Sequence, residues 1–107
     1  MGIRAHAFSI FNLIEEIVMF SQRITITNAE GLHARPAHEF IACAKQFQSK
    51  ITINRTGGGT PVNGKSLVLL LSLSATRGTE VLITAEGEDE SVAIATLIQL
   101  IKSGLGE

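Results

Sequence analysis

The alternation of apolar and polar residues predicts strands and helices that follow one another along most of the chain. Apolar residues occupy every second position in three segments, residues 23–27, 50–54 and 79–85. This period is typical of a strand with one solvated face. Residues 61–63 are shorter and begin with Pro61, which is tolerated in an edge strand. The pattern therefore predicts three regular strands and one short edge strand.

Three other segments have the spacing of helices. Residues 36–47 repeat apolar side chains at intervals of three and four, and residues 88–102 do the same. Pro36 is compatible with a first helical turn, and Glu88, Asp89 and Glu90 favour a helix start, where negative charge complements the helix dipole. A third, intensely apolar run, residues 67–73, follows Ser66 and fits a short helix. The buried stripes are expected to consist of Ala37, Phe40, Ile41 and Ala44 in the first helix and Ile94, Leu97, Ile98 and Ile101 in the last.

The element order is strand, helix, strand, strand, helix, strand, helix. Because the strands alternate cleanly, one face of the sheet is expected to be solvated and the other covered by helices. This favours an antiparallel sheet in an α+β domain. The 107 residues suffice for one domain and not two.

The first eighteen residues are unusually apolar, which raises the question of a membrane span or a signal peptide. Glu15 and Glu16 interrupt the run, so the roughly 20 clean residues of a membrane span are missing, and no signal-peptide cleavage site follows. Ile10, Leu13, Ile14 and Ile17 have helical spacing. We expect a compact domain over residues 19–107, starting near Met19, and an extension over residues 1–18. The extension is open to three readings: a plain extension, an alternative start or an oligomerisation helix.

Composition and charge exclude several classes of function. The net charge is −1, so no basic excess points to nucleic acid. Cys43 is the one cysteine, which excludes an internal disulfide and fits a cytoplasmic location. It lies in an apolar helical stretch and is expected to be a small core residue. One cysteine and three scattered histidines do not make a metal site, and no cofactor is expected.

Residues 31–37, which read Gly-Leu-His-Ala-Arg-Pro-Ala, carry the most informative chemistry. His33 precedes a predicted helix start, where unpaired N–H groups and the helix dipole favour a phosphate. Imidazole is a competent nucleophile at neutral pH. Arg35 could pair with phosphoryl oxygens through its planar guanidinium group. This arrangement suits reversible phosphoryl transfer, although a capping histidine beside a solvated arginine would leave the same pattern.

The same run resembles the phosphorylation-site signature of the HPr family, the histidine phosphocarriers of the bacterial sugar phosphotransferase system. Residues 63–66, followed by an apolar helix, resemble the second motif of that family. Residues 78–81, leading into residues 86–90, resemble its last strand and the entry to its last helix, and the terminal residues 105–107 are also similar to the family. The resemblance covers roughly residues 20–107. It implies an open-faced β-sandwich: a four-stranded antiparallel sheet covered on one face by three helices, in the order βαββαβα.

The resemblance also implies a function, partners and residue roles. His33 would accept a phosphoryl group on Nδ1 from phosphorylated Enzyme I and pass it to IIA components of sugar permeases. Arg35 would hold the phosphate, with Ala34, Pro36 and Ala37 forming the helix start that supports it. Ser66 would be the site of a regulatory HPr kinase/phosphorylase, with a transcriptional regulator as a further partner. The residues that correspond to the docking surface are Leu67, Val68 and Leu71, with His38 added from the first helix.

Of three alternatives to this function, one fails on the length of the chain and two stay open. Residues 59–66 fit the Walker A pattern letter for letter and lie between a strand and a helix, as a nucleotide-binding loop would. Only 41 residues follow Ser66 (107 − 66), too few for the remaining parallel sheet. The chain could also be a regulatory paralogue that acts through Ser66, or one domain of a larger multiphosphoryl transfer protein. The triple glycine at 57–59 and the apolar extension leave room for such specialisation.

Overall fold

Four strands form one antiparallel sheet in the order β1-β4-β2-β3. The computed structural model describes residues 21–107. Along the chain its elements are β1 (Ser21–Thr25), α3 (Ala34–Ala44), β2 (Lys50–Arg55), β3 (Val62–Asn63), α4 (Leu67–Ser72), β4 (Glu80–Glu86) and α5 (Glu90–Lys102). The order of strands and helices is the one that the hydrophobic pattern predicts.

The two faces of the sheet differ in polarity, because successive side chains point to opposite sides of a strand. Ile24 lies opposite Val81, and Ile53 lies opposite Ile83, so these apolar side chains share one face. The other face is mainly polar, although Leu82 also lies on it, opposite Arg23 and Asn54. This face carries threonine, charged and amide side chains from all four strands, namely Arg23, Thr25, Lys50, Thr52, Asn54, Asn63, Glu80, Thr84 and Glu86.

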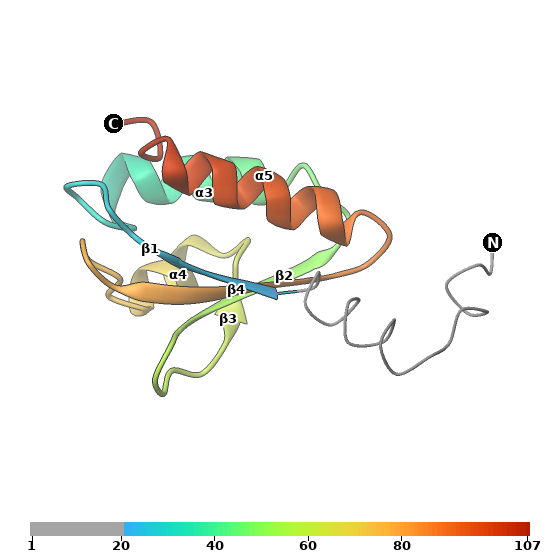
Figure 1. Ribbon diagram of the computed structural model, residues 1–107, viewed down its shortest axis with the longest axis horizontal. Helices are drawn as coiled ribbons and strands as arrows, with labels where there is room; N and C mark the ends of the chain where they lie inside the picture. Colours follow the sequence, from blue (N-terminus) through green and yellow to red (C-terminus); the bar gives the residue numbers. More distant parts are fainter. Residues whose placement is uncertain (1–20) are drawn as a thin grey trace.

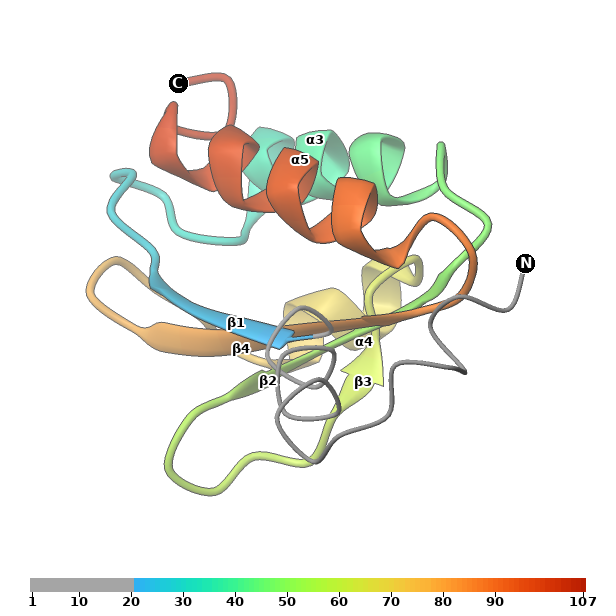
Figure 2. The same ribbon diagram turned by 45° about the vertical axis from the view of Figure 1, so that its right-hand side comes forward.

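Helices α3 and α5 lie side by side across the apolar face, as Figures 1 and 2 both show. Helix α4 contacts α3 and β3 and contributes Leu70 to the core. The largest fully buried side chains come from every layer and include Ile26, Phe40, Ile53, Leu70, Ile83, Leu97 and Ile101. The domain is thus an α+β open-faced sandwich, as expected.

The element boundaries differ from the predicted ones by a few residues. Helix α3 begins at Ala34, two residues before Pro36, and ends at Ala44 instead of Phe47. The last residues of the predicted helix form tight turns, in which Gln46 N–H donates to Cys43 O and Phe47 N–H to Ala44 O. The helix predicted within residues 1–18 lies outside the described residues, and the domain boundary near Met19 stays a prediction.

The nucleotide-binding alternative is not compatible with this sheet. A P-loop follows a strand of a parallel sheet, whereas every strand pair here is antiparallel. Val62 and Asn63, which would lie inside the loop, pair with β2 as an edge strand. Over residues 21–107, no helix is long and apolar enough to cross a membrane.

Candidate functional site

The loop between β1 and α3 carries His33. Hydrogen bonds within the loop and one to Ala75 hold it in place. Asn28 and Gly31 close a turn, because Gly31 N–H donates to Asn28 O and Asn28 Nδ2 donates back to Gly31 O at 2.9 Å. Leu32 is fully buried, and its N–H donates to Ala75 O at 2.8 Å. Gly31 has a φ of +68°, and a Cβ there would lie 2.5 Å from Ala75 O. Glycine is therefore required at position 31, two residues before the histidine.

His33 is the N-cap residue of α3. Its backbone is extended and its side chain is half-buried, yet the imidazole makes no capping hydrogen bond to the first turn. The N–H groups of Ala34 and Arg35 have no acceptor within the helix, because the first turn of any α-helix leaves them unpaired. The imidazole and two outward N–H groups thus share one helix end, which is suited to an anion.

The three residues that were assigned to support a phosphate differ in what they can do. Ala34 is exposed and has a φ of +53°, a left-handed conformation that costs an alanine about 1 kcal/mol. Pro36 has no N–H, and Ala37 lies beyond the unpaired first turn, so neither is a donor for a phosphate. Both are buried under the helix start. We infer that Ala34 offers a donor, whereas Pro36 and Ala37 fix the backbone from below.

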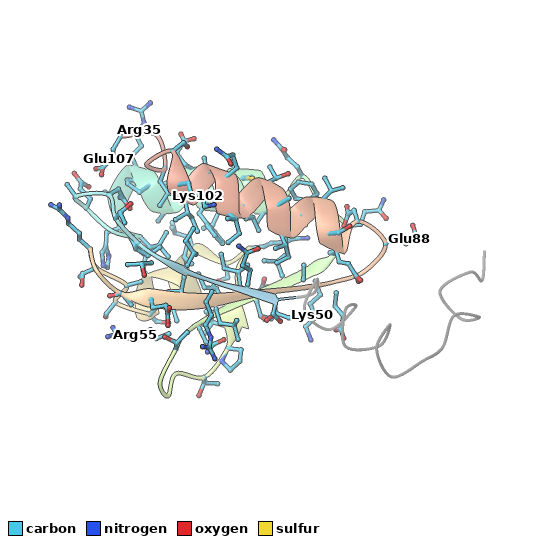
Figure 3. The ribbon with its side chains drawn as sticks, viewed as in Figure 1. Arg35, Lys50, Arg55, Glu88, Lys102 and Glu107 are labelled. Atoms are coloured by element: carbon cyan, nitrogen blue, oxygen red, sulfur yellow. The ribbon has the colours of Figure 1, made fainter. Side chains whose placement is uncertain are left out.

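Arg35 is exposed one helical position from Ala34 and leaves its guanidinium group accessible. Figure 3 shows Arg35 and Glu107 at the same end of the molecule. The Glu107 carboxylate accepts hydrogen bonds from Asn28 Nδ2 at 3.1 Å and from Glu30 N–H at 3.3 Å. Sequence reasoning missed Asn28 and Glu107, because a contact between residues this far apart leaves no local pattern.

Helix α4 has a single buried stripe and presents the rest of its apolar side chains to solvent. Leu70 is fully buried, whereas Val68 is 77% exposed, Leu69 41% and Leu71 37%. We call these three exposed residues the apolar patch. Leu67 is half-buried, and His38 is exposed on α3, which contacts α4. The expectation that the run 67–71 is too apolar for core packing alone is confirmed.

Ser66 is the N-cap of α4 and adjoins the apolar patch. Its Oγ accepts a hydrogen bond from Leu69 N–H at 3.3 Å, and its backbone is extended. This contact gives the serine a structural role as a helix cap. The residue as a whole is half-buried.

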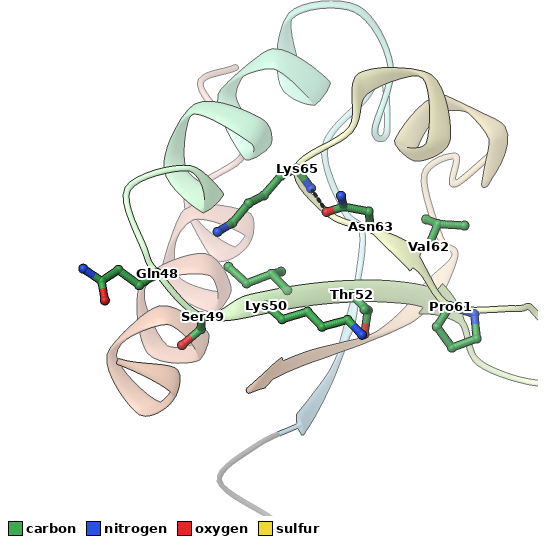
Figure 4. A pocket seen from close by; sticks show the side chains of 9 residues that line it. Gln48, Ser49, Lys50, Thr52, Pro61, Val62, Asn63 and Lys65 are labelled. Atoms are coloured by element: carbon green, nitrogen blue, oxygen red, sulfur yellow. Dashed lines mark hydrogen bonds between the residues drawn. The ribbon is translucent and has the colours of Figure 1, made fainter. Parts of the chain in front are cut away.

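A pocket of about 500 Å³ lies between the starts of β2 and β3, and none of the site residues named above lines it. In Figure 4, Lys65 reaches from the segment before α4 over this pocket, and its N–H donates to Asn63 Oδ1 at 2.9 Å. Lys65 Nζ donates to Phe47 O at 2.6 Å. The lysine therefore links the segment before Ser66 to the turn that follows α3. Its ammonium group is already engaged by the carbonyl of Phe47.

Cys43 has the environment of a packing residue. It is half-buried against the core, and burial raises the pKa of its thiol, which disfavours the reactive thiolate. This agrees with the expectation of a small core residue.

Comparisons with known proteins identify the family of this chain. Residues 20–103 match the family model described as the PTS HPr component phosphorylation site. The chain is 45% identical to the phosphocarrier protein HPr of Haemophilus influenzae over 83 residues, which cover 78% of this chain and 95% of that protein. It is 39% identical over 90 residues to the multiphosphoryl transfer protein of Salmonella typhimurium, covering 83% of this chain and 24% of that protein.

A solved structure extends the likeness to three dimensions. The crystal structure of HPr-C-His from Thermoanaerobacter tengcongensis superimposes with a TM-score of 0.77 at 41% identity, covering 81% of this chain and 96% of that one. Family model, sequence and fold therefore agree over the segment that carries His33. This chain belongs to the HPr family, the phosphocarrier proteins of the phosphotransferase system.

Proposed function

We propose that His33 is the residue that carries the phosphoryl group, accepting it from phosphorylated Enzyme I and passing it to IIA components of sugar permeases. The single observation that carries this proposal is the uncommitted imidazole of the N-cap residue. The ring nitrogen of a capping histidine would accept a hydrogen bond from the first turn, whereas the imidazole of His33 makes no such bond.

The transfer is a displacement at phosphorus. A lone pair on His33 Nδ1 forms the new N–P bond while the bond between phosphorus and its donor on Enzyme I breaks. In a second displacement, a nucleophile on the IIA component attacks the same phosphorus and the His33 N–P bond breaks, which returns the lone pair to Nδ1. Catalysis of this kind depends on positioning and on neutralising the oxygens. The N–H groups of Ala34 and Arg35 and the guanidinium of Arg35 supply positive potential on the side where those oxygens would lie.

The apolar patch supplies a docking surface for the partners. Exposed apolar side chains gathered on one face are typical of protein–protein contact. Leu67, Val68 and Leu71 lie on α4, and Leu32 next to His33 is bonded to the turn that ends this helix. A partner could therefore contact the patch and His33 together, with His38 at the margin. The single cysteine, Cys43, fits a reducing compartment, and we propose that the protein acts in the cytoplasm.

We further propose that phosphorylation of Ser66 regulates docking, through an HPr kinase/phosphorylase and a transcriptional regulator. A phosphoryl group on Ser66 would add a charge of about −2 next to the apolar patch. Such a charge would disfavour a partner that buries Val68 and Leu71. The position of the half-buried Ser66 at the start of α4, next to the apolar patch, supports this proposal.

The test of the carrier function uses phosphoenolpyruvate, Mg²⁺ and purified Enzyme I with the full chain. We expect a gain of one acid-labile phosphoryl group by intact mass and a phosphohistidine signal by phosphorus NMR. His33→Ala should lose both. His6→Ala is the matched control, since it removes a histidine outside the residues that match the family model. Acid-labile phosphate on His33→Ala would overturn the assignment.

A further inference from the structure

The side chain of Arg55 closes the C-terminal end of helix α4 from a different part of the fold. Arg55 is the last residue of β2, and its Nη1 donates to Leu73 O at 3.3 Å and to Ser74 O at 3.0 Å. The last carbonyl groups of a helix have no partner within it, and a cation next to them is favoured by the helix dipole. Arg55 therefore supplies from β2 what α4 lacks at its own end.

Helix α4 needs such outside support more than the longer helices do. It has six residues, and helices this short are marginal without tertiary contacts. Ser74, the residue after the C-cap Leu73, has a φ of +52°, a conformation that is unfavourable for serine. The Ser74 carbonyl also accepts a hydrogen bond from Thr76 N–H at 3.0 Å. Hydrogen bonds thus stabilise this turn, whereas the positive φ of Ser74 destabilises it.

The loop that carries His33 packs on the same turn. Ala75 O, one residue after the carbonyl that Arg55 binds, accepts the N–H of Leu32. Gly31 packs so closely on Ala75 and Thr76 that no side chain would fit between them. Residues 73–76 therefore join the apolar patch on one side to the histidine on the other.

We propose that Arg55 is a positioning residue for phosphoryl transfer, which sets the placement of the apolar patch relative to His33 through residues 73–76. This inference rests on the proposed function, because it assumes a partner that contacts both surfaces at once. In Figure 3, Arg35 lies at the top of the left-hand end and Arg55 lies well below it, so Arg55 acts through the turn and not on the phosphate.

The test compares two phosphoryl donors with the full chain of Arg55→Met. With phosphorylated Enzyme I, which must dock, we expect KM to rise roughly fivefold, the size of one net hydrogen bond, with kcat little changed. Phosphoramidate is a small donor that needs no docking: the imidazole nitrogen displaces ammonia from its phosphorus. Its rate on Arg55→Met should equal that on the unmodified chain. Arg55→Lys keeps a cation that can donate to the carbonyls, so its KM should lie between the values of Arg55→Met and the unmodified chain.

Arg23→Met is the matched control, because it makes the same change on the exposed polar face of β1. It should leave both rates unchanged. An unchanged KM for Arg55→Met would overturn the inference, and so would a parallel fall of both rates, which would show a loss of folded protein only. If the unmodified chain accepts no phosphate from Enzyme I but reacts with phosphoramidate, the proposed function fails instead.

Discussion

Asn28 donates a hydrogen bond from Nδ2 to the Glu107 carboxylate at 3.1 Å, although 79 positions separate the two residues. The same carboxylate accepts the N–H of Glu30. The loop that presents His33 is therefore tied to the segment after α5, and the tie has a donor on the loop and an acceptor on the segment. Because Asn28 is the donor and Glu107 the acceptor, replacing the amide nitrogen of Asn28 by an oxygen is enough to break the hydrogen bond.

Replacing that donor by a carboxylate should destabilise the loop. Asn28 is 7% exposed, so Asn28→Asp places a largely buried charge next to Glu107 and removes the bond to Gly31 O. We expect the free energy of unfolding at neutral pH to fall by about 2 kcal/mol, measured by urea titration. The loss should shrink as the pH falls, since the repelling pair binds a proton. Asn28→Ala removes the same donor without the charge, and an Asp variant more stable than Ala would contradict this account.

Asp89 should make the fold less stable in acid. The Ser49 hydroxyl and the N–H groups of Gln48 and Ser49 donate to its carboxylate, and these bonds hold its pKa below the ordinary value. A lowered folded pKa contributes stability above the unfolded pKa, and this contribution is lost as pH falls through the folded one. Asp89→Asn should therefore lose less stability below about pH 4 than the unmodified chain.

The measurement is the urea midpoint as a function of pH, with Glu88→Gln as the control. Glu88 is exposed one residue earlier, and the change removes the same charge. Identical pH profiles for Asp89→Asn and the unmodified chain would show that the Asp89 bonds do not distinguish the two protonation states.

Ser74→Gly should stabilise the domain by about 1 kcal/mol, because glycine adopts a positive φ without the penalty that serine bears. The main-chain carbonyl that Arg55 binds is retained. Ser72→Gly is the opposite control, since Ser72 lies within α4 and donates to Leu69 O. It should lower the free energy of unfolding by about 0.5–1 kcal/mol. A destabilised Ser74→Gly would mean that the serine side chain matters to the turn.

Val68→Asp should weaken docking without unfolding the protein. Val68 is the most exposed residue of the apolar patch, so its loss leaves the core intact, whereas a charge there must be desolvated in a complex. We expect the KM for Enzyme I to rise roughly tenfold and the unfolding midpoint to stay constant. Val92→Asp makes the same change at an exposed valine of α5. Equal effects of the two variants would argue against a local patch.

Arg35→Ala should slow phosphoryl transfer with little change in stability, because the side chain is exposed. Single-turnover transfer from Enzyme I is the measurement, and removal of one charge-assisted contact predicts a loss of roughly tenfold to a hundredfold. Arg35→Lys keeps the charge and loses the planar fork. Full recovery by lysine would assign the effect to charge alone, whereas an unchanged rate for alanine would remove Arg35 from the site.

The sequence predicts those features that arise from local patterns. The alternation in β2 and β4 and the stripe in α5 place these elements within one or two residues of their observed bounds. The placement of His33 before a helix is likewise local. In contrast, the contacts of Arg55 with the end of α4, of Asp89 with the α3–β2 turn and of Glu107 with Asn28 each join segments from different elements. No spacing rule links such partners, because only the packed fold brings them together.

The strand order has a consequence for how this protein is made. β4 lies at the centre of the sheet, between β1 and β2, yet it is the last strand of the chain. While the chain emerges during translation, β1 therefore has no neighbour to pair with, and β2 has only the two residues of β3. The sheet cannot close until most of the chain has been synthesised, so we expect folding to be a late and largely concerted event. During that interval the apolar face of β2 stays accessible to chaperones.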